Sequence, residues 1–334
     1  MGKNLGSKSV RVIIFLLTIF LSGLVFSESG SSVPVRGTAM TKNTIIDGSR
    51  KISYYFSQAK SKSAPLLLMI QGSGCIPVMN IPDKGMVYST MYGLLPLANE
   101  GDFSVMAVEK PYSGTVGSEK LWDVASSCSK EFHEDFTAES WIRAISMSLA
   151  DVKSKYPEVV REGVVLFGFS EGAVISSVLS NKIDNVKNVI LFGGSGTVQL
   201  YDFILNSYQQ CETETIDCVD DVYENLSSIR NDPSSFTQFA WGHPYKRWSS
   251  FFKIDPVLEL LKSSARVYIA FGMNDRSTPP LSQELAIAQL RLQEMDVTAR
   301  RVPGANHMMI NELDPDIEDF GREIQRALEW VKKE

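Results

Sequence analysis

One serine of this 334-residue chain stands in the sequence setting that nucleophilic catalysis requires. Ser170 occupies the centre of a G-x-S-x-G pattern at residues 168–172, between the apolar runs 163–167 and 173–179. This arrangement predicts a strand, a tight turn and a helix, with the serine at the turn. Small neighbours let the surrounding chain approach a residue whose backbone is strained. The free N–H groups at the start of the helix would then face a developing oxyanion.

Segments of strand length and amphipathic segments alternate along most of the chain. The expected strands are Arg50–Ser57, Pro65–Ile70, Phe103–Val108, Val164–Phe169, Val189–Phe192, Arg266–Phe271 and Val297–Val302. The expected helices are Ala138–Tyr156, Pro280–Met295 and Pro315–Val331. Strands that are apolar on both faces and alternate with helices are typical of central strands in a parallel sheet. We therefore expect a doubly wound, mostly parallel α/β sheet.

Two stretches interrupt this alternation. The first, Tyr112–Asp135, has a loop-like composition. The second runs from about Ser195 to Pro256 and is acidic early and aromatic late. It separates Val189–Phe192 from Arg266–Phe271, which are the fourth and fifth core strands when Pro65–Ile70 is counted as the first. We interpret it as a cap over the carboxyl edge of the sheet, although an ordinary helix pair on the sheet fits the same pattern. Three of its aromatic residues could line a substrate pocket or form the core of the cap: Trp241, Tyr245 and Trp248.

From roughly Ile52 to its end, the chain resembles the α/β-hydrolase family, whose triad follows the order Ser, then Asp or Glu, then His. Asp275, in the segment 272–279 after the fifth strand, looks like the family's acid turn. His307, in the segment 303–307 after the last strand, looks like its histidine loop. The resemblance implies that His307 takes the proton of Ser170 and that Asp275 orients the imidazole. All three would lie at the carboxyl edge of the sheet, where such folds form their sites.

The resemblance also implies an oxyanion hole made of two backbone N–H groups. One belongs to Glu171, and the other comes from the loop Gln71-Gly72-Ser73-Gly74, where Ser73 is our first choice and Gly74 the alternative. The family often has His-Gly at this point, so Gln71 is a departure. Gly72 and Gly74 are also candidates for contact with substrate, although a plain tight turn would explain them. The side chain of Glu171 could serve the helix dipole or bind a cationic part of the substrate.

Composition and the remaining motifs argue against several other classes of protein. The net charge of −6 disfavours a nucleic-acid partner. The three histidines are His133, His243 and His307, and no H-E-x-x-H motif pairs two of them. We therefore expect no catalytic metal and no cofactor. The oligomeric state is not predictable from these features.

The N-terminus predicts an export signal. Lys3, Lys8 and Arg11 precede the uncharged apolar stretch Val12–Phe26, and the pattern allows cleavage after Ser27. This stretch is short for a membrane-spanning helix, although an uncleaved anchor remains the alternative. We therefore expect an exported chain, periplasmic or secreted, with no membrane contact once the signal is removed. The predicted organisation is a signal peptide at 1–27, core at 28–194, cap at 195–256 and core at 257–334.

The four cysteines fit an oxidising compartment, in which disulfides persist. Cys211 and Cys218 lie close together in an acidic, loop-like segment, which favours that pair and leaves Cys75 with Cys128. Four free thiols are the alternative. No C-x-x-C motif supports a zinc or thioredoxin-type site.

A serine nucleophile in this setting predicts acyl transfer to water. Our first hypothesis is a carboxylesterase that cleaves small or medium esters through an acyl-enzyme on Ser170. The second is a peptidase or amidase for small peptide-like substrates, because capped members of the family include such enzymes and Glu171 could recognise an amine. A non-enzymatic binding module on the same fold is the third, and it is disfavoured because all three triad residues are present.

Overall fold

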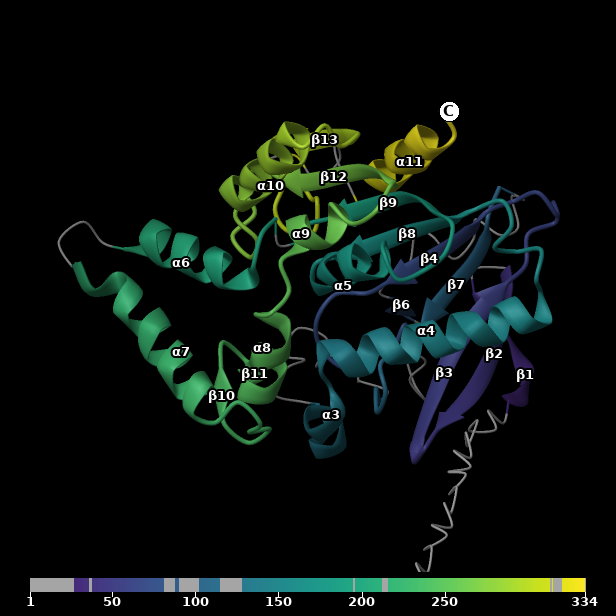
Figure 1. Ribbon diagram of the computed structural model, residues 1–334, viewed down its shortest axis with the longest axis horizontal. Helices are drawn as coiled ribbons and strands as arrows, with labels where there is room; N and C mark the ends of the chain where they lie inside the picture. Colours follow the sequence, from purple (N-terminus) through teal and green to yellow (C-terminus); the bar gives the residue numbers. More distant parts are fainter. Residues whose placement is uncertain are drawn as a thin grey trace, which may run out of the picture.

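One large, mixed sheet organises the molecule, as the computed structural model shows (Figure 1). The structure describes residues 27–35, 38–80, 88–89, 102–114, 128–194, 196–211, 216–312, 314 and 320–333. Within them the sheet has nine strands, in the order β1-β2-β3-β7-β4-β8-β9-β12-β13. The strand bounds are β1 Ser27–Val35, β2 Thr38–Asp47, β3 Arg50–Ser57, β4 Leu66–Ile70, β7 Ser104–Val108, β8 Val164–Phe169, β9 Val186–Phe192, β12 Arg266–Gly272 and β13 Val297–Val302.

Six neighbouring strands of the sheet pair in parallel: β7, β4, β8, β9, β12 and β13. Strands β1, β2 and β3 extend the sheet beyond β7 as antiparallel strands. The predicted doubly wound, mostly parallel sheet is therefore confirmed. Two short ribbons stand apart from it: β5 (Met79–Asn80) with β6 (Tyr88–Ser89), and β10 (Phe239–Ala240) with β11 (His243–Pro244).

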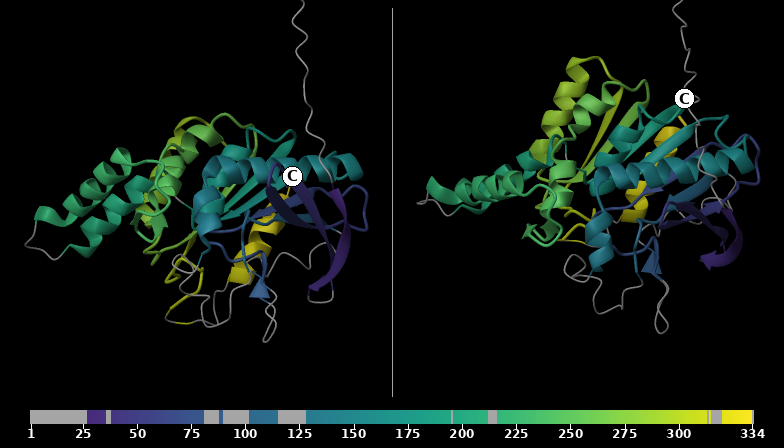
Figure 2. Two further views of the ribbon diagram at one scale, coloured as in Figure 1. Left: turned by 90° about the horizontal axis from the view of Figure 1, so that it is seen from below. Right: turned by 60° about the horizontal axis from the view of Figure 1, so that its bottom comes forward.

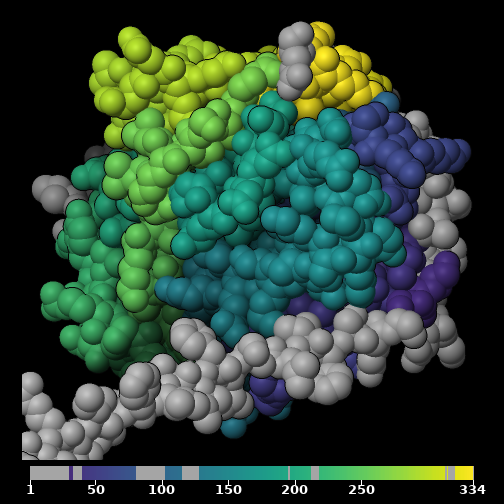
Figure 3. Space-filling model, turned by 45° about the vertical axis from the view of Figure 1, so that its right-hand side comes forward, coloured from purple at the N-terminus to yellow at the C-terminus, as the bar shows by residue number. Residues whose placement is uncertain are grey.

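Helices cover both faces of the sheet, as its parallel part requires. Their bounds are α3 Lys130–Asp135, α4 Ala138–Lys155, α5 Glu171–Leu179, α6 Gln199–Gln210, α7 Asp220–Asn231, α8 Tyr245–Phe251, α9 Pro256–Leu260, α10 Pro280–Leu292 and α11 Phe320–Val331, with a 3₁₀ helix η2 at Ile216–Val219. Helices α4, α5 and α10 pack on one face, and α11 packs on the other. In the space-filling view, the teal part of the chain fills the middle of the face shown (Figure 3).

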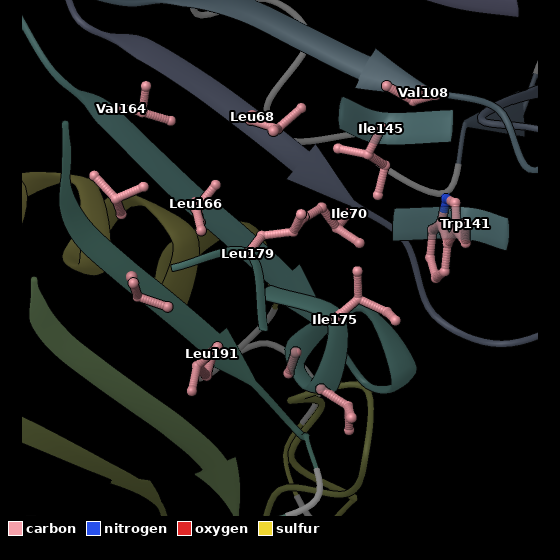
Figure 4. Close-up of a cluster of buried hydrophobic side chains, with 14 of the residues drawn as sticks. Leu68, Ile70, Val108, Trp141, Ile145, Val164, Leu166, Ile175, Leu179 and Leu191 are labelled. Carbon is pink, nitrogen blue, oxygen red and sulfur yellow. The ribbon is translucent and has the colours of Figure 1, made fainter. Parts of the chain in front are cut away.

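Successive side chains of each central strand enter opposite cores, because strand residues alternate between the two faces. On β4, Leu66 and Leu68 face the core under α4 and α5, whereas Leu67 and Met69 face the core under α11. Figure 4 shows part of the first core, with these labelled side chains gathered between the sheet and the helices: Leu68, Leu166 and Leu191 from strands, Trp141 and Ile145 from α4, and Ile175 and Leu179 from α5.

The segment between β9 and β12 is the main departure from the α/β alternation. Helices α6 and α7 project away from the sheet as a pair (Figures 1 and 2), whereas α8 and α9 return toward it. Phe251, Val257 and Leu260, which are buried in the core shared with α4 and α5, fix this return. We refer to residues 195–256 as the inserted segment.

Two differences from the sequence-based expectations concern local structure, and two further expectations lie largely outside the described residues. Lys130–Asp135, which we expected to be part of a loop, forms α3, because the Ser129 side chain caps the helix by accepting from the Phe132 N–H. Strands β1 and β2 were not predicted, since their alternation is weak and polar. The expected start of the last helix at Pro315 lies outside the described residues, as does the export signal predicted at 1–27 apart from Ser27, the first residue of β1. Within the described part of the chain, no helix combines the length and apolar character of a membrane span.

Candidate active site

Ser170 lies at a sharp turn between β8 and α5, with the backbone angles φ 54° and ψ −121°. A non-glycine residue rarely adopts such a positive φ, so the fold imposes strain at this position. The flanking glycines permit the turn for steric reasons. A Cβ at Gly172 would collide with the carbonyl oxygen of Ile70, and a Cβ at Gly168 would collide with that of Gly172. The spacing of the motif is therefore required by close contact between the turn and the end of β4.

The structure brings the three residues of the expected triad together. The Nε2 atom of His307 is 3.1 Å from Oγ of Ser170, and its Nδ1 atom is 2.8 Å from Oδ2 of Asp275. Ser170 follows β8, Asp275 follows β12 and His307 follows β13, so all three lie beyond strand carboxyl ends. This arrangement allows the imidazole to accept the serine proton while the carboxylate holds the opposite ring nitrogen.

Asp275 is held in one orientation by groups that the sequence did not single out. Its Oδ1 accepts the backbone N–H groups of Ser277 and Thr278, at 2.7 and 2.9 Å. Its Oδ2 accepts the Thr278 hydroxyl at 2.8 Å in addition to His307. Because the carboxyl group is buried and four donors surround it, its orientation is fixed. The pattern Asp275-x-Ser277-Thr278 is typical of a turn in which the Asp side chain accepts from backbone N–H groups, so the fixed orientation of Asp275 could have been inferred from it.

His307 packs in a narrow slot between the ends of two strands. Phe169 lies on one side, with its ring centroid 5.2 Å from that of the imidazole. Gly193, at the end of β9, lies against the ring and has a φ of 51°. A Cβ there would be only 3.3 Å from two ring atoms of His307, so glycine gives the imidazole its room.

The expected oxyanion loop lies against the nucleophile. A Cβ at Gly72 would be 3.3 Å from Cβ of Ser170. Neither the N–H of Ser73 nor that of Glu171 donates a hydrogen bond to another of the described residues. Both therefore remain our candidates for the two donors that an oxyanion hole needs.

The side chain of Glu171 has a different role from the one we considered for it. Its carboxylate is buried and pairs with two cations: Lys110, with Nζ 2.9 Å from Oε1, and Arg247, with Nε 2.9 Å from Oε2. The interpretation of Glu171 as a binding group for a cationic substrate is therefore wrong, because both oxygens are already engaged. The sequence signal was weak, since Lys110 and Arg247 are far from Glu171 along the chain.

Charge interactions dominate this buried trio. Burial raises the pKa of Glu171, but Lys110 and then Arg247 outweigh it and lower the pKa from its ordinary value of 4.5 to about 2. The stabilisation that Glu171 contributes is therefore present above about pH 4.5 and is lost as the pH falls toward 2. Burial and the charge of Arg247 lower the pKa of the neighbouring His243 to about 3, so this histidine is neutral at pH 7.

Replacing Glu171 by glutamine is expected to destabilise the protein by about 3–5 kcal/mol, because two buried cations would lose the carboxylate that pairs with both of them. Urea unfolding monitored by circular dichroism measures this change. Glu284→Gln is the matched control, since Glu284 pairs with Arg301 at the surface and its loss should cost about 0–1 kcal/mol. Equal effects of the two substitutions would contradict the buried ion pairs.

The aromatic candidates of the inserted segment pack mainly on one another. The Trp241 ring stacks on Phe203 with a centroid distance of 4.2 Å, and Trp248 stacks on Phe252 at 5.1 Å. Tyr245 packs at the edge of the same cluster. This arrangement matches the alternative that these residues form the core of the segment. Their expected role in lining a substrate pocket remains a proposal.

The cysteines lie in the two pairs that the sequence favoured. Cys75 and Cys128 have Cα atoms 5.7 Å apart, and Cys211 and Cys218 have Cα atoms 5.6 Å apart, with both pairs bonded through sulfur. The first bond ties the residue after the oxyanion loop to the chain just before α3. Among the residues that the structure describes, no group of three His, Cys, Asp or Glu side chains is placed to hold a metal ion.

We compared the chain with known protein families, curated sequences and solved structures. No protein-family model and no curated protein sequence matches the chain. Among solved structures, acylaminoacyl peptidase from Pyrococcus horikoshii is similar with a TM-score of 0.56 and 13% identity, over 92% of this chain and 48% of the peptidase. The chain thus spans about half the length of that enzyme.

Two similar structures match over most of their own length. Acetyl xylan esterase 1 from Thermoanaerobacterium has a TM-score of 0.55 and 14% identity, over 92% of this chain and 87% of the esterase. A carboxyl esterase from Bacillus coagulans has a TM-score of 0.56 and 15% identity, over 88% and 98%. The chain therefore has the α/β-hydrolase fold, as the sequence predicted.

Proposed function

We propose that this protein is a serine hydrolase that cleaves carboxylesters of small or medium size through an acyl-enzyme on Ser170. The observation that carries the proposal is the continuous chain of contacts from Oγ of Ser170 through His307 to Asp275. Similarity of fold to several esterases supports it.

The geometry suggests an order of events. His307 Nε2 removes the proton from Ser170 as Oγ attacks the ester carbonyl, and Asp275 stabilises the resulting imidazolium. The carbonyl oxygen becomes an oxyanion that accepts from the N–H groups of Ser73 and Glu171. The intermediate collapses when His307 protonates the departing alcohol, which leaves an acyl-enzyme. Water, deprotonated by the same histidine, then releases the acid and restores Ser170.

Cleavage of small peptide-like substrates is the second candidate, supported by the similarity to acylaminoacyl peptidase. The argument that Glu171 could recognise the amine of a peptide no longer supports this candidate, because the carboxylate is buried in ion pairs. We therefore rank ester hydrolysis first.

We also propose that the protein acts after export, in the periplasm or outside the cell. The two disulfides support this assignment, because such bonds persist in oxidising compartments. We further propose that the inserted segment acts as a cap whose inner surface selects the substrate.

A substrate panel tests the chemical class. Purified protein is offered p-nitrophenyl esters of increasing acyl length and aminoacyl p-nitroanilides, with turnover followed by p-nitrophenol or p-nitroaniline release. We expect kcat/KM for acetate to butyrate esters to exceed that for every anilide by more than tenfold. A preference for the anilides would assign the protein to the peptidase class. Absence of turnover for both groups would contradict the proposed hydrolase.

A further inference from the structure

Lys110 occupies a position that the reaction described above does not explain. It follows the end of β7 by two residues, and its side chain is fully buried. Its Nζ atom is 2.6 Å from the carbonyl oxygen of Gly72, 3.0 Å from that of Gly74 and 2.9 Å from Oε1 of Glu171. A buried lysine is costly unless its charge is compensated, so three such partners indicate a specific role.

The number of partners defines the state of this amine. A neutral amine has two N–H donors, whereas an ammonium group has three. Three acceptors within 3.0 Å therefore match an ammonium group that uses every donor. The rings of Trp141 and Phe136, whose centroids lie 4.3 and 4.8 Å from Nζ, add cation–π stabilisation.

The three partners of Lys110 belong to the two chain segments that supply the oxyanion donors. The carbonyl groups of Gly72 and Gly74 lie on either side of Ser73, so one ammonium group clamps the loop around the Ser73 N–H. The third partner is the side chain of Glu171, whose own N–H is the other donor. The distance between the two donors is therefore set in part by Lys110.

Arg247 completes this arrangement from the inserted segment. It pairs with the second carboxylate oxygen of Glu171 and lies 3.8 Å from the ring centroid of Trp248. Arg247 therefore ties the inserted segment to the same carboxylate that Lys110 binds. The buried carboxyl of Glu109 also interacts electrostatically with Lys110.

We propose that Lys110 is a positioning residue for the oxyanion hole, which fixes the Ser73 loop relative to Glu171. The inference rests on the proposed serine hydrolase function, and it concerns how the two donors are held rather than which bond is cleaved. Lys110 acts through backbone carbonyl groups and a carboxylate, so it does not touch the substrate.

Lys110→Met is the decisive variant. Methionine keeps an unbranched side chain against Trp141 and Phe136, and it leaves Glu171 and Arg247 as a neutral pair, so the variant should fold. We expect kcat for p-nitrophenyl acetate to fall about 100-fold, as for misplacement of an oxyanion donor. KM should stay within about threefold of the wild-type value, because the ground-state ester gains little from these donors.

Hydrogen–deuterium exchange gives a readout that does not depend on turnover. In Lys110→Met, the peptide covering residues 71–74 should exchange about ten times faster, while peptides of α4 and α11 should be unchanged. Lys262→Met is the matched control, since Lys262 forms an exposed ion pair with Glu259, and both readouts should equal those of the wild type. Lys110→Gln, which retains part of the hydrogen bonding, should give intermediate values and serves if the methionine variant does not fold.

If Lys110→Met showed the same exchange at 71–74 as the wild type and a kcat within twofold of the wild-type value, the proposed role of Lys110 would be wrong. A fall in thermal stability without a change in kcat would also overturn it, because it would indicate a purely structural lysine. Failure of the hydrolase proposal has a different signature: the wild type itself would turn over no ester, and the exchange measurement would still decide whether Lys110 holds the loop.

Discussion

Replacing Ser170 by alanine is expected to lower kcat for an activated ester by about a millionfold, to a rate that the oxyanion donors and substrate binding still keep above the uncatalysed one. The effect is large because the acyl-enzyme cannot form without Oγ, and His307 then has no proton to accept. Alanine keeps a Cβ and therefore the same backbone strain at φ 54°. The fold should persist, which circular dichroism and thermal unfolding check.

Two controls accompany this prediction. Ser146→Ala on α4, whose hydroxyl only bonds the Ile142 carbonyl, should retain full activity. Active-site titration of each preparation excludes contamination by wild-type enzyme. If Ser170→Ala retained more than about 1% of wild-type kcat, a group other than this hydroxyl would be the nucleophile.

Replacing Asp275 by asparagine is expected to lower kcat about 10⁴-fold through the tautomer of His307. The native carboxylate accepts four donors, two on each oxygen. An amide NH₂ at the Oδ2 position would face the imidazole and force Nδ1 to accept a hydrogen bond. The ring proton would then sit on Nε2, which could no longer take the proton of Ser170. The opposite amide orientation is disfavoured because it places NH₂ against two backbone N–H groups.

The pH dependence of the asparagine variant provides the supporting readout. The loss of kcat in Asp275→Asn is expected to come from a neutral imidazole in the wrong tautomer. Raising the pH should therefore not restore kcat, measured with a saturating concentration of a p-nitrophenyl ester. Asp296→Asn, which removes an exposed pair with Arg266, should change kcat less than twofold. A loss of less than tenfold in Asp275→Asn would mean that Asp275 does not orient the histidine.

The sequence predicted the parts of this structure that follow from local periodicity. The strands at 50–57, 164–169 and 297–302 match their predicted bounds, and helix α4 ends one residue before its predicted end. Apolar runs of strand length between amphipathic segments define such elements, because burial on both faces leaves no polar alternation. Ser170 could be singled out because the motif is contiguous in sequence, although Gly172 is required by contact with Ile70 of the neighbouring β4.

The features that sequence missed depend on contacts between distant segments. Nothing near Lys110 indicates that its side chain reaches Gly72, Glu171 and the neighbourhood of Arg247. Strands β1 and β2 lack the continuous apolar run of the central strands and pair at the edge of the sheet, with Met40 and Ile45 of β2 buried in its cores. Of the two interpretations of the Glu171 side chain, the substrate-binding one is wrong, because a buried counter-ion and a solvent-facing one look alike in sequence.

Covalent labelling of the nucleophile tests the central claim most directly. The protein is treated with a fluorophosphonate, digested and analysed by mass spectrometry, with His307→Ala in parallel. We predict one adduct, on Ser170, that forms rapidly in the wild type and at least 1,000-fold more slowly in His307→Ala, because the hydroxyl then lacks its base. Absence of an adduct, an adduct on another residue, or equal labelling rates in the two proteins would contradict a Ser170–His307–Asp275 triad.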